Sequence, residues 1–206
     1  MTKKAEILAT ATHLLAMQGY SQMTMSTLAR MTGVAHGTIF YHFKNKEELF
    51  LEILKEFKAE ILREYQRHCN ESTIQSGMQQ LENAVAFYLH LSAQMADRFL
   101  LLHRHDAYEL SQVNPDCRRH LEAIYDCFIG MFEQAIAAGQ ADGTLAARPT
   151  AHKAALLVFT MVDGLVRFNT YNLYDANSLH GDLIASIRRM LQPSAPSGGG
   201  QTANDH

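Results

Sequence analysis

The sequence has few of the residues that interrupt helices or build strands. Only four of its 206 residues are proline, and two of these, Pro193 and Pro196, lie in a Gly/Ser-rich tail. Alternating runs of β-branched residues are absent, while apolar residues recur at helical spacing along most of the chain. The sequence therefore predicts an all-α fold of about nine helices.

Tryptophan is absent, and there are only three cysteines, at positions 69, 117 and 127. Their spacing includes no CxxC pair, so we interpret them as reduced, buried thiols of a cytoplasmic protein. No apolar stretch reaches the ~18 residues that a membrane span needs. Polar residues such as Glu6 and Thr10 leave no unbroken apolar run near the start of the sequence, which argues against a signal peptide.

Positive charge is concentrated at one end of the chain. Residues 1–46 hold five basic side chains and one acidic one, whereas the remaining 160 hold thirteen basic and twenty acidic, for a net charge of −3 overall. A positive head on an acidic body is typical of a small DNA-contacting unit attached to a larger domain.

The first half of the chain contains clear helix boundaries. A first helix should end at Gly19, and Thr24 should cap a short second helix that ends near Gly33. A third short helix is predicted over Ala35–Phe43. Asn45 should cap a long fourth helix that runs to about residue 68.

Longer helices follow the polar stretch Asn70–Thr73. They are predicted over about 74–96, 98–110, 121–136, 154–168 and 179–191, with Gly139 ending the third of these and Pro149 in the first turn of the fourth. We therefore expect a DNA-binding domain over 1–46, extending to about 60 with the start of the fourth helix. A regulatory domain should cover 47–192, and a disordered tail 193–206.

Two short helices joined by a tight turn at Gly33 form the pattern of a helix-turn-helix. At ~100° per residue, Ile39 and Phe43 should face the core of the small domain. The opposite face carries four groups that can reach bases and phosphates: Gly37, Thr38, Tyr41 and His42.

The segment TMSTLARMTGVAHGTIFYHFKNKEELF, residues 24–50, resembles the N-terminal domain of the tetracycline-repressor (TetR) family almost position by position. The preceding Gly19-Tyr20 also matches, and the resemblance covers about residues 3–60. Further along, the Met161-Val-Asp-Gly164 segment is of a type found late in such chains. The resemblance implies a transcriptional regulator, most often a repressor that a small molecule releases from DNA.

The resemblance also implies roles for individual residues. Thr24 and Ser26 occupy positions that often contact DNA, and Lys46 matches a phosphate-binding lysine. His36 stands where Lys or Arg is frequent, so its charge there would depend on pH. Phe40 replaces a common tyrosine and cannot donate a hydrogen bond, which leaves Tyr41 to supply that phosphate contact.

In this family the middle helices surround a ligand cavity, which implies a small apolar or aromatic effector and no cofactor. Candidate lining residues are Tyr88, Met95, Phe99, His103, Tyr125, Phe128 and Phe168, with His103 or Tyr125 as the polar handle. The helix predicted over 154–168 is apolar nearly all round, and together the last two helices offer a surface for a partner. They predict a homodimer on a near-palindromic operator, formed through Leu157, Met161, Leu165, Leu183, Ile184 and Ile187.

Two alternative functions remain open from the sequence. Histidines 103 and 105 could belong to a metal-responsive site, but they would lie ~200° apart on one helix. His105 and Glu109 share a face and would still need a third ligand. A helical enzyme is the second alternative, although no nucleophile elbow, phosphate loop or zinc-protease motif occurs.

Overall fold

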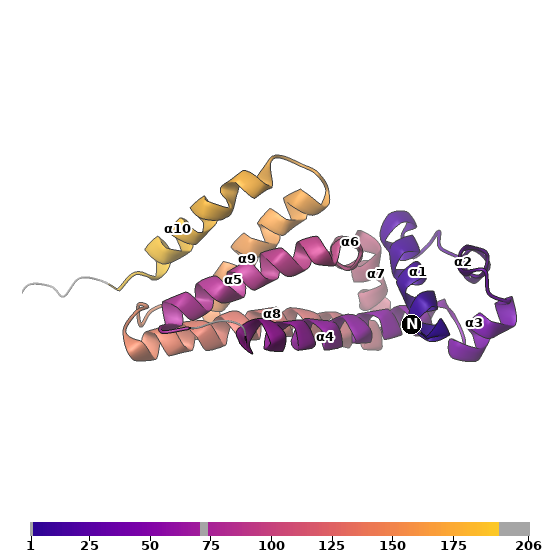
Figure 1. Ribbon diagram of the computed structural model, residues 1–206, viewed down its shortest axis with the longest axis horizontal. Coiled ribbons are helices and arrows are strands. Elements are labelled where there is room, and N and C mark those ends of the chain that lie inside the picture. The colour runs from indigo at the N-terminus through magenta and orange to yellow at the C-terminus, as the bar shows by residue number, and fades with distance from the viewer. Residues whose placement is uncertain (1, 71–73, 194–206) are drawn as a thin grey trace, which may run out of the picture.

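The computed structural model describes residues 2–70 and 74–193, and within these ranges the chain is entirely helical. Ten α-helices and one short 3₁₀ helix form an elongated molecule, with a small three-helix head at one end and a larger body at the other (Figure 1). The all-α prediction is confirmed. The predicted disordered tail lies, beyond Pro193, outside the described residues.

The head consists of α1 (Lys3–Gln18), α2 (Met25–Thr32) and α3 (His36–His42). Its boundaries follow the predicted capping chemistry: the Thr24 hydroxyl accepts a hydrogen bond from the Thr27 amide at 3.0 Å, and Gly33 ends α2 in the left-handed conformation. Apolar side chains of all three helices, including Leu15, Leu28 and Ile39, are buried together. The head therefore has a core of its own.

The helix α4 (Lys46–Asn70) joins the head to the body. Its first turn is capped by Asn45, whose side-chain oxygen accepts the Glu48 amide at 2.8 Å. Phe50 packs in the head, whereas Phe57 contacts Phe99 of the body at a ring separation of 5.6 Å. The predicted boundary at residues 46/47 thus falls inside the first turn of a continuous helix.

The body is built around α8 (Pro115–Asp142), which packs against α4, α5 (Gly77–Gln94), α7 (His105–Val113) and α9 (Ala151–Thr170). α6 (Ala96–His103) lies against α1 and joins the body to the head. The chain ends with η1 (Ala176–Leu179) and α10 (His180–Leu191), which leans over α5 and α9 (Figure 1).

Two helix boundaries differ from the prediction. The single helix expected over 98–110 is two helices, because the backbone of Arg104 is extended and separates α6 from α7. Gly139 does not end its helix: α8 continues to Asp142 and ends at Gly143 in the left-handed conformation. Gly139 lies where α5 approaches α8 closely, and a Cβ on Gly77 would overlap its backbone.

Smaller corrections concern proline and cysteine. Pro149 precedes α9 by two residues and is not in its first turn, whereas Pro115 occupies the first turn of α8. All three cysteines are free, but only Cys117 is fully buried, and burial raises the pKa of its thiol to about 11.

Candidate DNA-reading helix and effector site

The outward face of α3 carries the predicted DNA-contacting residues. Ile39 and Phe43 are buried beneath it, with 0% and 2% of their surfaces exposed, whereas Tyr41 is 85% exposed. Gly37 is exposed, and Thr38 and His42 are half-buried beside it. The two faces predicted from helical periodicity are therefore the two faces that the fold produces.

Thr24, Ser26 and His36 lie together where α2 and α3 begin. The Ser26 hydroxyl is 3.3 Å from Nε2 of His36, and all three side chains are exposed. The ring of His36 also contacts Phe40, with ring centroids 4.8 Å apart. A hydroxyl and an imidazole at adjacent helix N-termini form a polar edge to the reading face, and helix N-termini favour phosphate.

Lys46 is placed differently from a lysine that is free to bind phosphate. Its ammonium donates to the backbone carbonyls of Tyr20 at 2.6 Å and Met23 at 3.1 Å, and lies 4.4 Å from the centre of the Tyr20 ring. Two of its three N–H groups are thereby used inside the head. The sequence did not predict this contribution of Lys46 to the structure of the α1–α2 connection.

Five of the seven predicted effector-site residues form one aromatic cluster inside the body. The Tyr88 ring lies 4.5 Å from Phe128 and 5.4 Å from Phe99, and Phe99 lies 6.2 Å from His103. Tyr125 joins the cluster through Phe159, which contacts both tyrosines. Tyr88, Phe99 and Phe128 are fully buried, so in this structure they fill the core of the body where an open cavity was predicted.

The other two predicted effector residues lie apart from this cluster. Met95 is half-buried and lines a surface hollow beside α1, and Phe168 is 41% exposed and contacts Tyr174. Helical periodicity predicts which residues are apolar and buried but not which residues they contact. The sequence alone therefore could not separate these two from the aromatic cluster.

A half-buried carboxylate that the sequence did not identify organises the cluster. Oδ1 of Asp163, on α9, accepts hydrogen bonds from the Tyr88 hydroxyl at 2.7 Å and from Nε2 of His103 at 2.9 Å. Burial opposes ionisation of Asp163, but the hydrogen bonds from His103 and Tyr88 and the nearby Arg167 outweigh it, so the pKa of Asp163 is lowered. An acidic residue inside the very apolar sequence of α9 was the available signal.

The other ring nitrogen of His103 is buried and has no hydrogen-bond partner among the described residues. Tyr88 has its pKa raised well above the ordinary value, chiefly by burial and then by Asp163. Tyr125 is bonded to the hydroxyl of Tyr108. The body thus holds a polar centre with one unsatisfied atom inside an aromatic surrounding, at the place predicted for the polar handle.

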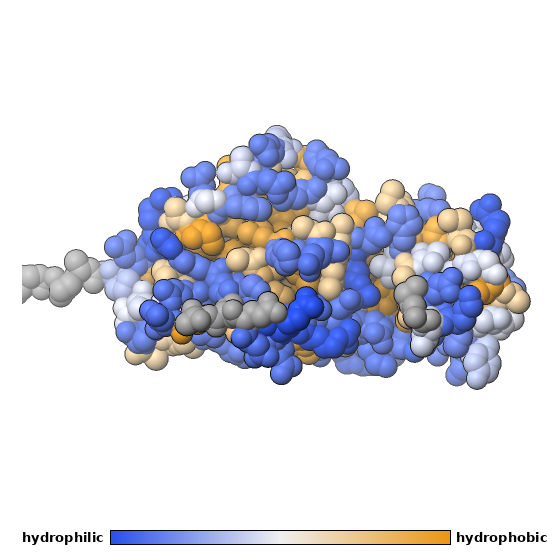
Figure 2. All heavy atoms as spheres, viewed as in Figure 1, coloured by the Kyte–Doolittle hydropathy of each residue, from blue (hydrophilic) through white to orange (hydrophobic). Residues whose placement is uncertain are grey.

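Two hollows lie outside this cluster, both against α5: one faces α10, and the other faces the end of α9 and the segment that follows it. The first, of about 730 Å³, is lined by small and aliphatic residues of α5 and α10 such as Ala86 and Ile184; the other, of about 460 Å³, adjoins it at Leu89, Ala93 and His180. Figure 2 shows apolar residues gathered in this region below α10. None of the predicted effector residues lines either hollow.

The predicted dimer residues divide into two groups. Leu165, Leu183 and Ile187 are buried within the single chain, so their assignment to a subunit interface is corrected. Leu157 is 49% exposed, and Met161 and Ile184 are half-buried. An apolar stripe predicts burial, but only the packing of α9 on α10 decides which part is buried internally.

The metal alternative receives no support from the geometry. His103 and His105 lie on separate helices, with His103 bonded to Asp163 and His105 paired with Glu109 at 3.3 Å on an exposed face. Among the described residues, no group of three or more His, Cys, Asp or Glu side chains is arranged to hold a metal ion. No helix in the described ranges is long and apolar enough to cross a membrane.

A helix-turn-helix head with an outward-facing reading helix, joined to a separate helical body, defines a DNA-binding transcriptional regulator. Residues 7–53 match the sequence profile of the bacterial regulatory proteins of the tetR family. The match covers the head and the start of α4, so this part of the chain is a DNA-binding domain of the tetR type.

Known relatives resemble the chain over nearly its whole length. The fatty acid metabolism regulator protein of Bacillus subtilis is 24% identical over 190 residues, 92% of each chain. A crystal structure of FadR from Bacillus subtilis in complex with stearoyl-CoA has a TM-score of 0.72 at 22% identity, covering 89% of this chain and 96% of that one. A regulator from Saccharomonospora viridis in complex with choline has a TM-score of 0.79 at 22% identity, covering 92% and 97%. At these identities the structures establish the fold.

Proposed function

We propose that the protein is a cytoplasmic repressor that binds a near-palindromic operator as a homodimer and is released by a small, largely apolar effector. The observation that carries the DNA-binding part is the two-sided character of α3, with Ile39 and Phe43 anchored in the head and Tyr41 exposed. A two-fold dimer would present two copies of this helix to successive major grooves.

Selection of bound fragments from a random DNA pool tests operator binding directly. We expect an enriched sequence with two inverted half-sites about one helical turn apart. Fluorescence anisotropy with the enriched sequence then gives the affinity. An enriched sequence without two-fold symmetry would contradict the dimer, and no enrichment would contradict operator binding.

Tyr41→Ala tests the assignment of the reading face. Loss of one hydrogen bond or ring contact to DNA is expected to weaken operator affinity about tenfold, while the unfolding temperature stays that of the wild type because the side chain is exposed. Tyr174→Ala removes a tyrosine that is 81% exposed in the body and should leave the affinity unchanged. Equal affinities of the two variants would refute the role of Tyr41.

For the effector, we propose that an apolar chain or ring enters the aromatic cluster around Tyr88 and Phe128, with its polar atom at the unpartnered nitrogen of His103. The buried, unsatisfied atom supports a ligand there, because such atoms in proteins nearly always have a partner. The similarity to a regulator in complex with stearoyl-CoA supports an acyl thioester as the first probe.

Stearoyl-CoA should raise the unfolding temperature and lower operator affinity, since a ligand that favours one of two states weakens binding to the other. Free coenzyme A is the matched control without the apolar chain. A flat thermal response to stearoyl-CoA and to a broad panel of apolar compounds would contradict effector binding.

A further inference from the structure

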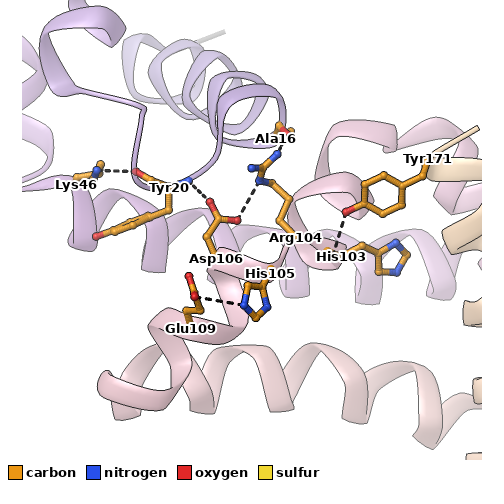
Figure 3. Close-up of polar contacts among 9 residues, drawn as sticks. All are labelled: Ala16, Tyr20, Lys46, His103, Arg104, His105, Asp106, Glu109 and Tyr171. Atoms are coloured by element: carbon orange, nitrogen blue, oxygen red, sulfur yellow. Dashed lines mark hydrogen bonds and ion pairs between the residues drawn. The ribbon is translucent and has the colours of Figure 1, made fainter.

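The junction between α6 and α7 forms a polar clamp on the head of the molecule (Figure 3). Nη1 of Arg104 donates to the backbone carbonyl of Ala16 at 3.1 Å. The carboxylate of Asp106 accepts the backbone N–H of Tyr20 and, at 3.0 Å, Nε of Arg104. We call these two side chains, Arg104 and Asp106, the clamp.

The clamp satisfies backbone groups at the end of α1 and just after it. Ala16 lies in the last turn of α1, where carbonyls lack a partner within the helix. Tyr20 follows the helix, and its N–H points toward the body. Residues of the body thus cap the C-terminus of a helix in the head, and charged partners make these hydrogen bonds stronger than neutral ones.

Gly19 is required for this close approach. Its φ of +87° favours glycine, and a Cβ there would lie 2.5 Å from Nη2 of Arg104 and 2.6 Å from Oδ2 of Asp106. Any residue larger than glycine at position 19 would therefore overlap the clamp side chains.

The clamp continues into the helix that follows the reading helix. The Tyr20 residue donates its N–H to Asp106 and accepts Nζ of Lys46 on its carbonyl at 2.6 Å. Lys46 is the first residue of α4, four positions after the end of α3. Tyr20 consequently links the body, the head and the start of α4 through two opposed hydrogen bonds.

On its other side, the clamp is one residue away from the polar centre of the body. His103 precedes Arg104 directly, its ring is bonded to Asp163, and its carbonyl accepts the Tyr171 hydroxyl at 3.2 Å. The end of α6 is therefore held at fixed points by α9. A movement of α6 relative to α9 would displace Arg104 by way of the peptide bond that joins it to His103.

We propose that Arg104 and Asp106 are positioning residues for DNA binding, which set the angle at which the body carries the reading helix α3. They do not touch DNA themselves. This inference rests on the proposed operator binding and adds to it a specific connection between the body and the head.

The test uses the full-length protein and the operator obtained by selection. Arg104→Ala and Asp106→Ala should each weaken operator affinity about tenfold at fixed salt, and Arg104→Lys, which keeps a cation within reach of Ala16, should recover part of the loss. Glu109→Gln is the matched control: it neutralises a carboxylate on α7 that contacts only His105 among the described residues. It should bind as the wild type does.

The salt dependence of binding separates positioning from simple loss of stability. A misplaced reading helix contacts fewer phosphates, so the slope of log affinity against log salt should become shallower in the two alanine variants. A variant that is only less stable would keep the wild-type slope. Its operator affinity, calculated per folded molecule, would also equal that of the wild type.

Hydrogen exchange of the backbone supplies a measurement without DNA. Asp106→Ala should accelerate exchange of the Tyr20 amide, while amides of α8 remain protected as in the wild type. Wild-type affinity and wild-type slope in both alanine variants would overturn the clamp. Absence of operator binding by the wild-type protein would instead overturn the proposed function.

Discussion

Gly37 lies at the second position of the reading helix, and a Cβ added there would meet no atom of the folded chain within 4 Å. The fold itself therefore does not require glycine at this position. The exposed backbone suits a close approach to a ligand, and in the proposed function that ligand is the wall of the major groove.

Gly37→Ala separates stability from recognition. We expect the free energy of unfolding to rise by up to about 1 kcal/mol, because alanine favours a helix more than glycine does. Operator affinity should nevertheless fall, since the methyl group occupies the space into which DNA would come. Urea unfolding and anisotropy measure the two quantities. Gly130→Ala, another glycine with open space around it, should gain stability and keep its affinity.

Asp163 makes the stability of the body depend on pH. The pKa of its carboxyl is lower in the folded protein than the ordinary 3.8, because hydrogen bonds from His103 and Tyr88 outweigh the effect of burial. The ionised form therefore stabilises the fold above about pH 3.8, and this contribution is lost as the pH falls through the lower, folded-state pKa.

Thermal unfolding between pH 6 and pH 3 measures this effect. The unfolding temperature of the wild type should fall more steeply toward acid than that of Asp163→Asn, which has no carboxyl to protonate. The variant should also be less stable at neutral pH, because a charged partner of His103 is lost. Asp126→Asn, an exposed position on α8, is expected to follow the wild-type curve. Parallel curves for Asp163→Asn and the wild type would contradict the assignment.

At the scale of elements, α5 and α8 approach each other closely at two glycines, Gly77 and Gly139. The amide of Gly77 donates to Asp142 at 2.7 Å, and its Cα lies against the backbone of Gly139. A side chain at position 77 would overlap backbone atoms, which cannot rotate away as a flexible side chain can.

Gly77→Ala should accordingly lower the free energy of unfolding by about 3 kcal/mol, at the upper end of the usual cost of overpacking. Urea denaturation gives the value directly. The Gly130→Ala variant on α8 again provides the comparison, because its methyl group would meet nothing within 4 Å. A loss of less than 1 kcal/mol would mean that the helices can separate at small cost.

For the whole molecule, the important feature of α9 is that it has two apolar faces, one buried in the body and one exposed to solvent. One is buried against the body at residues such as Val158 and Leu165, and the other exposes Leu156 at 40% and Leu157 at 49%. Large neighbouring apolar side chains in solvent are typical of a surface that binds a partner. In the proposed function that partner is a second copy of the chain.

Leu157→Glu tests this surface. Because the leucine is half exposed, a charge there should cost the monomer little stability, whereas it would place two charges in a two-fold interface. Light scattering should give the mass of two chains for the wild type and of one chain for the variant, with a corresponding loss of operator affinity. A monomeric wild type at micromolar concentration would rule out the interface.

Much of this protein is determined locally, by the sequence alone. Thr24, Gly33 and Asn45 cap or end helices through bonds and backbone angles within a few residues of themselves, so their roles follow from residue type and spacing. The two faces of α3 follow from helical periodicity in the same way. A helix boundary was wrong at Gly139, where residue type predicts an end but α8 continues to Asp142, with Gly77 of α5 packed on its backbone.

Only the tertiary structure brings distant residues together. Asp163 meets Tyr88 and His103 across 75 and 60 positions of the sequence, and Arg104 and Asp106 reach Ala16 and Tyr20 across 88 and 86. No local pattern encodes such pairs. The helical spacing of apolar and polar residues shows which face a residue is on, but not whether that face meets solvent, a neighbouring helix or a second subunit. The sequence thus determines which helix can read DNA, and the packing of α6, α7 and α9 decides how that helix is held.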